Sequence, residues 1–300
     1  MISAENLLIP DWPDALNQVD IVKARFTLGF VSPCTVRPTD FIRLGRVLRT
    51  PVRQMLDPAD ELTVRQWQAL FQPAPSADPV ARRRFQKPAP ALVMTLPVMQ
   101  ETDIDTGEKL ECVVLFVGAG VSLIHVFLKS LIDLGHLGLV PGSGHFQVTE
   151  VYSISNGQPE KLAWRQDDPL DAFTCAVQPL DWLVSQDRVP DRLTISYETP
   201  VRLMVNGRPL RKPRFKQVFP FMLRRVTSMI YAHSGIELLD EPSRLLASVS
   251  SIDELETRLS WSDWRAIAGQ QDLVVGGFTG DMVVSGQAIA DIYWVLAVAS

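Results

Sequence analysis

The order in which hydrophobic periodicities change along the first half of the chain restricts the possible folds more than any other feature of the sequence. Strand-like stretches show apolar residues at alternate positions, and helix-like stretches show them three or four positions apart. Six such segments follow one another: strand 19–31, helix 39–50, strands 90–99 and 109–118, helix 120–135 and strand 145–154. This βαββαβ order predicts a ferredoxin-like unit, with helices on one side of an antiparallel sheet.

The second half repeats part of this order. Its segments are strand 191–207, helix 216–235, a glycine-rich hairpin within 271–286 and a closing helix at 287–300. We therefore predict an α+β chain of two tandem ferredoxin-like (RRM-like) units, the second lacking its last strand. Residues 156–190 mix Pro, Asp and Gln without clear periodicity, so we predict a linker there, between an N-terminal domain at 1–155 and a C-terminal domain at 191–300.

Composition excludes several classes of protein. The chain has 300 residues, of which 46% are hydrophobic, as in a folded globular protein. The N-terminal stretch is acidic and interrupted by prolines, so we read no signal peptide and expect a cytoplasmic protein. The apolar run 113–128 is too short to span a membrane. The three cysteines are far apart, which indicates neither a disulfide framework nor a zinc site, and we expect no metal or other cofactor.

The distribution of charge is more informative than its sum. A net charge of -5 argues mildly against a nucleic-acid partner. The stretch 199–236, which we call the basic segment, nevertheless contains no Asp or Glu. Its cations are Arg202, Arg208, Arg211, Lys212, Arg214, Lys216, Arg224 and Arg225. So many like charges repel one another unless an anion screens them, and this segment is the strongest signal for nucleic acid.

A glycine-rich loop at 135–148, GHLGLVPGSGHFQV, separates the helix 120–135 from the strand 145–154. Glycines of this kind let a backbone approach a phosphate, adopt a positive φ, or reverse direction. Taken alone, the loop is more typical of a structural connection. His145 at its end could contact a phosphate, stack on a base, or serve as a hydrogen-bonded residue at the start of the strand.

Two smaller groups of arginines carry a weaker signal. The first, Arg43, Arg46, Arg49 and Arg53, would occupy one broad side of a helix without interleaved acidic residues. The second is the run 82–84, which could be a solvated turn or a phosphate-binding group. Among the remaining histidines, His125 is expected at the edge of the core and His233 at the end of a helix, where a cation is favoured by the helix dipole.

A rival interpretation comes from residues 113–123, VVLFVGAGVSL, where a strand runs into Gly118 and Gly120 and then into a helix. This order imitates a dinucleotide-binding fingerprint. However, Leu123 occupies the third glycine position, and the preceding segments indicate an antiparallel hairpin where the fingerprint needs a parallel βαβ unit. We therefore disfavour a nucleotide-dependent enzyme.

Five stretches together resemble the CRISPR-associated endoribonucleases that cut repeat RNA, the Cas six-type family of the RAMP superfamily. They are LGRVLR (44–49), KPAPALVMTLP (87–97), IDLGHLGLVPGSGHFQVTEV (132–151), YETPVRLMVNGRPL (197–210) and LSWSDWRAIAGQQDLVVGGFTGDMVVSG (259–286). The resemblance spans nearly the whole chain. No single motif is specific, and it is their order and spacing that carry the resemblance.

The resemblance implies a metal-independent endoribonuclease that binds the repeat hairpin and cleaves it by attack of a ribose 2'-hydroxyl on the adjacent phosphate. Many members have a histidine on or near the first helix, and here Arg46 stands at about that place. The catalytic residues it implies are Arg46, as a stabiliser of phosphorane charge, and His145. The RNA-binding residues it implies are Arg43, Gly138, Gly142, Ser143, Gly144, Arg208, Arg211, Lys212, Arg214, Lys216, Arg224 and Arg225.

The missing first-helix histidine leaves an alternative open. The chain could be a non-catalytic RAMP subunit that holds an RNA handle in a CRISPR effector complex. In either case the expected partners are CRISPR repeat RNA and other effector subunits, in antiviral defence, without a membrane.

Overall fold

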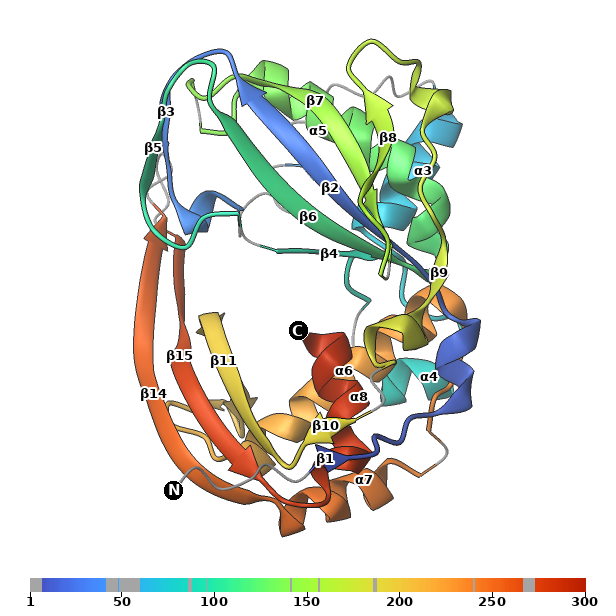
Figure 1. Cartoon of the computed structure of the whole chain (residues 1–300), viewed down its shortest axis with the longest axis vertical. Coiled ribbons are helices and arrows are strands. Elements are labelled where there is room, and N and C mark those ends of the chain that lie inside the picture. Colours follow the sequence, from blue (N-terminus) through green and yellow to red (C-terminus); the bar gives the residue numbers. More distant parts are fainter. Residues whose placement is uncertain are drawn as a thin grey trace. The chain divides into compact units, whose positions relative to one another are not determined.

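The computed structural model describes residues 7–41, 48, 60–85, 88–95, 97–140, 142–155, 157–185, 188–239, 241–266 and 273–300. The chain divides into two compact units, which we describe one at a time (Figure 1). Unit 1 comprises residues 1–18, 180–231 and 236–300, and unit 2 comprises residues 19–179 and 232–235.

Unit 2 is built on one antiparallel sheet. Its strands are β2 (Asp20–Phe30), β4 (Leu92–Met94), β6 (Lys109–Val117), β7 (Phe146–Ile154), β8 (Lys161–Arg165) and β9 (Gln178–Pro179). The strand order is β4-β6-β2-β7-β8, and β9 pairs with the beginning of β2. Apart from the additional strands β8 and β9, this is the order expected of a βαββαβ unit. A separate two-stranded ladder joins β3 (Cys34–Val36) to β5 (Thr102–Ile104).

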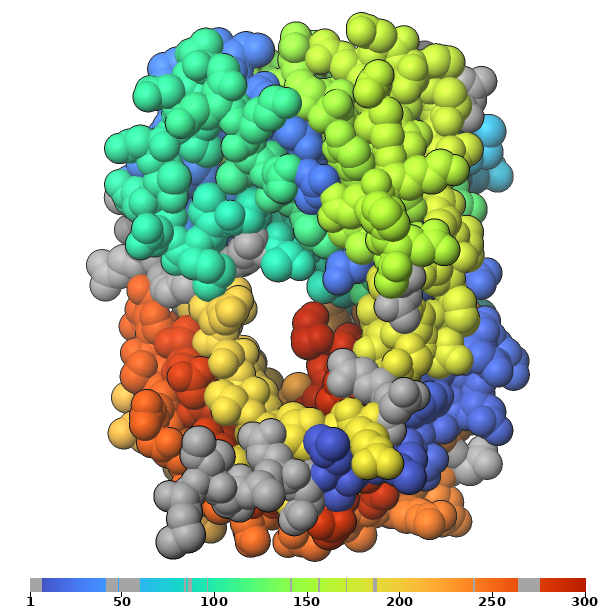
Figure 2. Space-filling model, in the orientation of Figure 1, coloured from blue at the N-terminus to red at the C-terminus, as the bar shows by residue number. Residues whose placement is uncertain are grey.

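The central strand β2 shows why the helices lie on one face of this sheet. Its alternate side chains from Val22 to Phe30 are buried, whereas Lys23 and Arg25 on the opposite face are partly exposed. The buried face packs against α3 (Glu61–Phe71) and α5 (Ile124–Leu137), which lie behind the sheet in Figure 1. Phe127 of α5 meets Phe26 edge-on, with ring centroids 5.1 Å apart. In Figure 2 the opposite face of the sheet is toward the viewer, with β6, β7 and β8 forming much of its surface.

The helix α5 follows a 3₁₀ turn, η2 (Gly118–Leu123), and ends later than the sequence predicts. Gly135, the expected C-cap, lies inside the helix, and Gly138 at φ +89° is the cap. A Cβ atom at Gly135 would lie 2.1 Å from the carbonyl oxygen of Phe146, so that glycine is explained by close contact with β7. The stretch 118–137 is the one helical stretch in the described ranges that is long and apolar enough to cross a membrane, and 56% of it is buried within unit 2.

Unit 1 contains a three-stranded sheet in the order β11-β15-β14 (Figure 1). Its elements are β1 (Leu7–Leu8), η1 (Asp14–Gln18), η4 (Leu180–Leu183), β10 (Val189–Pro190), β11 (Arg192–Val201), β12 (Met204–Val205), β13 (Arg208–Pro209), α6 (Phe215–Ser234), α7 (Pro242–Ser248), η5 (Val249–Ser251), β14 (Asp253–Ala266), β15 (Leu273–Ser285) and α8 (Ile289–Ala299). The end of α6, from residue 232, belongs to unit 2. Within the described ranges no strand pairs with the free edge of β11.

The prediction of a hairpin within 271–286 is wrong. Residues Leu273–Ser285 form the single strand β15, which pairs with β14, for which no strand was predicted. The glycines that suggested a turn are required by close packing inside the sheet. A Cβ atom at Gly280 would lie 2.1 Å from the carbonyl oxygen of Arg258, and one at Gly277 would lie 2.6 Å from the backbone of Pro200.

The predicted linker 156–190 contains ordered elements of both units. Unit 2 takes β8, the 3₁₀ turn η3 (Leu170–Ala172) and β9, and unit 1 takes η4 and β10. The segment shows no clear periodicity because its strands have only two to five residues, too few for a repeating pattern. The prediction of an α+β fold with antiparallel sheets is confirmed.

Candidate nucleic-acid interface

The glycine-rich loop joins α5 to β7 in unit 2. Gly138, Gly142 and Gly144 have φ angles of +89°, +79° and +67°, a region that side-chain-bearing residues seldom adopt. At Gly138 a Cβ atom would lie 2.3 Å from the carbonyl oxygen of Ser143, and at Gly144 it would lie 2.7 Å from Sγ of Cys34. At Gly142 no atom lies within 4 Å of this position. Packing thus explains Gly138 and Gly144, whereas Gly142 needs only its positive φ.

Hydrogen bonds within the loop determine which donors remain available. The Leu139 N–H donates to the carbonyl of Gly144 at 3.0 Å, and the Ser143 N–H donates to the carbonyl of Val140 at 2.9 Å. Gly142 is exposed, and neither its N–H nor the Ser143 hydroxyl bonds to a described residue. The loop therefore presents one backbone donor and one hydroxyl to a ligand.

His145 is held at the end of this loop by its backbone and its ring. Its N–H donates to Oγ of Ser32 at 2.9 Å, and its carbonyl accepts from the N–H of Val31 at 2.9 Å. The ring atom Nδ1 lies 3.0 Å from the carbonyl oxygen of His136, the exposed histidine in the last turn of α5. Because a carbonyl can only accept, Nδ1 carries the hydrogen, and Nε2 of the neutral ring is left with its lone pair.

The other histidines have structural surroundings. Nε2 of His233, at the end of α6, lies 2.9 Å from the carbonyl oxygen of Ala89, and the side chain is buried. His233 therefore contributes to packing in unit 2, beside Gly118, whose Cβ position would lie 2.3 Å from the His233 carbonyl. His125, expected at the edge of the core, is exposed and lines a cavity.

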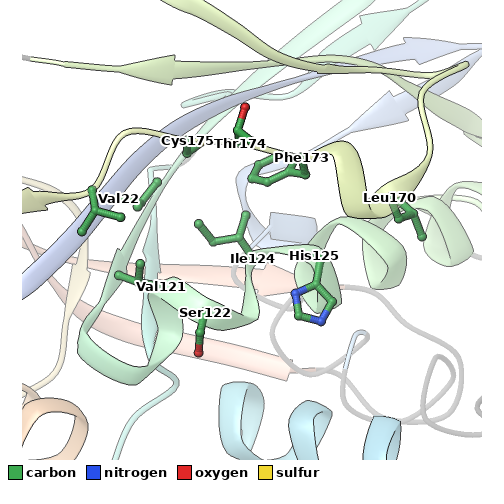
Figure 3. Close-up of a pocket in the computed structure, with 10 residues that line it drawn as sticks. Val22, Val121, Ser122, Ile124, His125, Leu170, Phe173, Thr174 and Cys175 are labelled. Atoms are coloured by element: carbon green, nitrogen blue, oxygen red, sulfur yellow. The ribbon is translucent and has the colours of Figure 1, made fainter.

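That cavity, of about 610 Å³, lies between β2, the beginning of α5 and the segment 170–177 (Figure 3). Its lining is mostly apolar and includes Phe173 and Ile124, and none of its described lining residues is Asp, Glu, Lys or Arg. These described residues do not provide the cations that a nucleotide phosphate needs. The dinucleotide interpretation also fails on topology, because β6 runs antiparallel to both of its neighbours, β2 and β4.

The basic segment lies in unit 1, apart from the last residues of α6. Its eight cationic side chains are all exposed, and none forms an ion pair with a described residue. In contrast, Arg25 on the sheet of unit 2 is paired with both Glu111 and Glu160, which raise its pKa. The cations of the basic segment therefore remain available for a polyanion.

Part of the basic segment lies in a short hairpin and in the first turn of α6, which follows it. The strands β12 and β13 form a hairpin whose turn residues, Asn206 and Gly207, have φ angles of +50° and +76°. After it, the Phe215 N–H at the first turn of α6 donates to Glu254 at 2.8 Å. A cavity of about 400 Å³ beside this turn is lined by Arg214, Phe215, Lys216, Val249, Ser250, Ile252 and Glu254.

The remaining predicted residues are distributed as follows. Arg43 and Arg46, like Arg49 and Arg53, lie outside the described residues. In the run 82–84, on the short helix α4 (Pro79–Arg84), Arg82 donates through Nε to the carbonyl of Ser76 at 3.1 Å. No group of three or more His, Cys, Asp or Glu side chains able to hold a metal ion occurs among the described residues.

Comparisons with known proteins agree with this description. The family model described as AF_1859_N, N-terminal domain, matches residues 53–172. No curated protein sequence matches the chain. A solved product complex of Cas6 (TTHB231), from Thermus thermophilus, matches with a TM-score of 0.51 at 16% identity, over 93% of this chain and 90% of that one. A chain of a partial Cas6-RT-Cas1--Cas2 complex matches with a TM-score of 0.53 at 10% identity, over 96% of this chain and 43% of that one. The fold is thus that of Cas6 structures, as the resemblance in sequence indicated.

Proposed function

We propose that this chain is a Cas6-type RAMP protein that binds CRISPR repeat RNA and cleaves it without a metal ion. The observation that carries the proposal is the basic segment, whose eight exposed cations have no carboxylate partner among the described residues of a Cas6-like fold. A ligand with regularly spaced phosphates would neutralise them. The RNA-binding residues that we propose are Arg43, Gly138, Gly142, Ser143, Gly144, Arg208, Arg211, Lys212, Arg214, Lys216, Arg224 and Arg225.

The proposed reaction is internal transesterification. The ribose 2'-oxygen forms a bond to the adjacent phosphorus, the bond from phosphorus to the 5'-oxygen breaks, and a 2',3'-cyclic phosphate and a 5'-hydroxyl result. One group must take the 2'-hydroxyl proton, another must protonate the leaving oxygen, and a cation must stabilise the phosphorane.

His145 fits the role of proton-transfer group. Its Nδ1–H is engaged by the His136 carbonyl, so Nε2 can accept a proton from a 2'-hydroxyl, or donate one when the ring is protonated. Arg46, which replaces the histidine common in this family, fits the role of the cation, because a guanidinium stays charged at every accessible pH. The Gly142 N–H and the Ser143 hydroxyl are two further donors for phosphate oxygens.

The expected setting follows from this activity. A protein that processes CRISPR transcripts works in the cytoplasm, where those transcripts are made. The match to a chain of a Cas6-RT-Cas1--Cas2 complex supports other CRISPR proteins as partners.

Binding of repeat RNA can be tested by gel-shift titration at two salt concentrations, with unrelated hairpins of equal length as the control. We expect tighter binding of the repeat, and an affinity that falls steeply with salt, because each bound phosphate contributes a slope of about -0.7 to -0.9 in log K against log salt. Equal affinity for unrelated RNA would contradict specific recognition of the repeat. An affinity that does not change with salt would contradict binding through phosphates.

A further inference from the structure

Trp261 on β14 has surroundings unlike those of a core tryptophan. Trp294 of α8 is 1% exposed, whereas Trp261 is only partly buried. Its indole lies across the neighbouring strand β15, where a Cβ atom at Gly276 would be 3.1 Å from Cζ2 of the ring. A side chain at Gly276 would therefore crowd the indole, and the glycine leaves room for the ring beside β15.

The orientation of this ring is also held by a hydrogen bond. Its Nε1–H donates to Oδ1 of Asp263 at 2.9 Å, two residues further along β14. The same carboxylate oxygen would lie 2.4 Å from a Cβ atom at Gly276, so Asp263 and Trp261 share the space that the glycine leaves. This hydrogen bond uses the only polar atom of the indole. A ligand can therefore interact with the ring only through its aromatic face.

A cation from the basic segment lies over that face. The guanidinium carbon of Arg211 is 5.5 Å from the centroid of the Trp261 ring. Arg211 is exposed and has no carboxylate partner among the described residues, and Lys212 beside it is also exposed. An indole whose orientation is held by a hydrogen bond, beside exposed cations, combines two features of single-stranded RNA sites, a stacking surface and positive charge.

We infer that Trp261 and Arg211 form a stacking site for one unpaired base of the bound RNA. This inference rests on the proposed function and adds recognition of a base to the binding of phosphates. The base must be unpaired and unstacked, because the faces of a base within a helix are covered by its neighbours. Trp261 supplies the stacking surface, and the Arg211 side chain, which lies over the ring in the free protein, must move to admit the base and then covers it or binds the phosphate next to it.

The inference can be tested with three variants and a set of RNAs. The variants are Trp261→Ala, Trp261→Phe and Arg211→Gln, each checked for an unchanged melting temperature. In the RNAs, one unpaired nucleotide at a time is abasic or carries 2-aminopurine, whose fluorescence falls when it stacks. We expect Trp261→Ala to weaken binding of repeat RNA by about 5- to 150-fold, the range for removal of one base-aromatic stack. Trp261→Phe should retain most of the affinity.

The abasic series identifies the base. At one unpaired position, removal of the base should lower the affinity of wild-type protein to the affinity that Trp261→Ala has for intact RNA. The same abasic RNA should bind Trp261→Ala no more weakly than intact RNA does, because the stack is already lost. At this position 2-aminopurine should be quenched by wild-type protein and not by Trp261→Ala. Arg211→Gln should weaken binding and lower the salt dependence.

The outcomes separate this inference from the proposed function. The stacking site would be overturned if Trp261→Ala bound repeat RNA tightly and with the usual salt dependence, and if each abasic change weakened binding of the variant as much as binding of the wild type. The proposed function would then still stand. A folded wild-type protein that binds no repeat RNA would overturn both. As a positional control, Gly276→Ala should lower affinity together with 2-aminopurine quenching, because the added methyl group would lie 2.4 Å from Oδ1 of Asp263 and so disturb the hydrogen bond that orients the indole.

Discussion

The Nδ1 atom of His145 lies 3.0 Å from the carbonyl oxygen of His136. His145 immediately precedes β7, and His136 lies in the last turn of α5. This hydrogen bond therefore connects the two elements on either side of the glycine-rich loop. It also determines the protonation pattern of the ring, because only an N–H can face a carbonyl. The neutral ring then presents a basic Nε2 without any rearrangement, as a general base requires.

Replacing His145 by Ala should therefore slow cleavage of repeat RNA by about 10²- to 10⁴-fold, the usual contribution of a general acid or base. Affinity should change much less, because the loop retains its own hydrogen bonds. The matched control is His136→Ala, which removes a neighbouring imidazole but keeps the carbonyl that orients His145. Single-turnover cleavage rates distinguish the two variants, and equal rates for both would show that His145 transfers no proton.

Binding should depend more on the basic segment than on the arginines of α4. Neutralising Arg211, Lys212, Arg214 and Lys216 together should weaken binding of repeat RNA more than neutralising the run 82–84, where Arg82 already donates to the carbonyl of Ser76. Salt titrations should give a lower slope for the first variant, by about 0.7 to 0.9 for each phosphate that is no longer bound. A greater decrease in affinity for the α4 variant would place the RNA on a different surface.

Two glycines of the loop should differ in their importance for stability. Gly144→Ala should lower the free energy of unfolding by more than Gly142→Ala, because its methyl group would meet Cys34 in addition to the strain of a positive φ. The strain alone costs about 1–2 kcal/mol. Urea denaturation of both variants measures the difference, and similar decreases would mean that Cys34 moves aside easily.

Tyr197 should make the stability of unit 1 sensitive to alkaline pH. Burial, with a smaller contribution from the Glu254 carboxylate, raises the pKa of Tyr197 to about 12, and its hydroxyl has no hydrogen-bond partner among the described residues. The folded state therefore keeps its proton where the unfolded chain, with a pKa near 10, loses it. The contribution to stability is complete below pH of about 10 and is lost as pH rises toward 12.

The variant Tyr197→Phe tests this linkage. Near neutral pH its free energy of unfolding should differ from that of the wild type by no more than about 1 kcal/mol, since an unpaired buried hydroxyl is removed. Between pH 9 and 11 the variant should lose less stability than the wild type. Parallel curves for the two proteins over this range would mean that Tyr197 does not titrate differently in the folded and unfolded states.

The elements that could be predicted from the sequence are those with a clear pattern of hydrophobic residues. The strand β2 has strand-like composition with partial alternation, and α5 has one apolar face, because each packs against the same core. The strand β14 was missed because DELETRLSWSDWRA carries polar or charged residues on both faces, and its pairing with β15 depends on glycines that resemble turn residues. A strand held mainly by its ladder leaves little trace in hydrophobicity.

The candidate site was predictable to a similar degree. The glycine-rich loop and the basic segment could be identified because their residue types are unusual for their length. Trp261 was not singled out, because its significance depends on Arg211, fifty residues earlier, and on Gly276 in the neighbouring strand. The bond from His145 to His136 depends on a backbone carbonyl, which no side-chain pattern reveals.

The most direct test of the central claim is incubation of repeat RNA with the protein in EDTA, followed by analysis of the new ends. The account predicts one cut, with a 2',3'-cyclic phosphate or its 3'-phosphate product upstream and a 5'-hydroxyl downstream. Replacing the 2'-hydroxyl by hydrogen at the scissile nucleotide should abolish the cut and leave binding nearly unchanged, and Arg46→Ala should slow it by about 10²- to 10³-fold. Tight binding without any cut, or a cut that requires a metal ion, would contradict the proposed reaction.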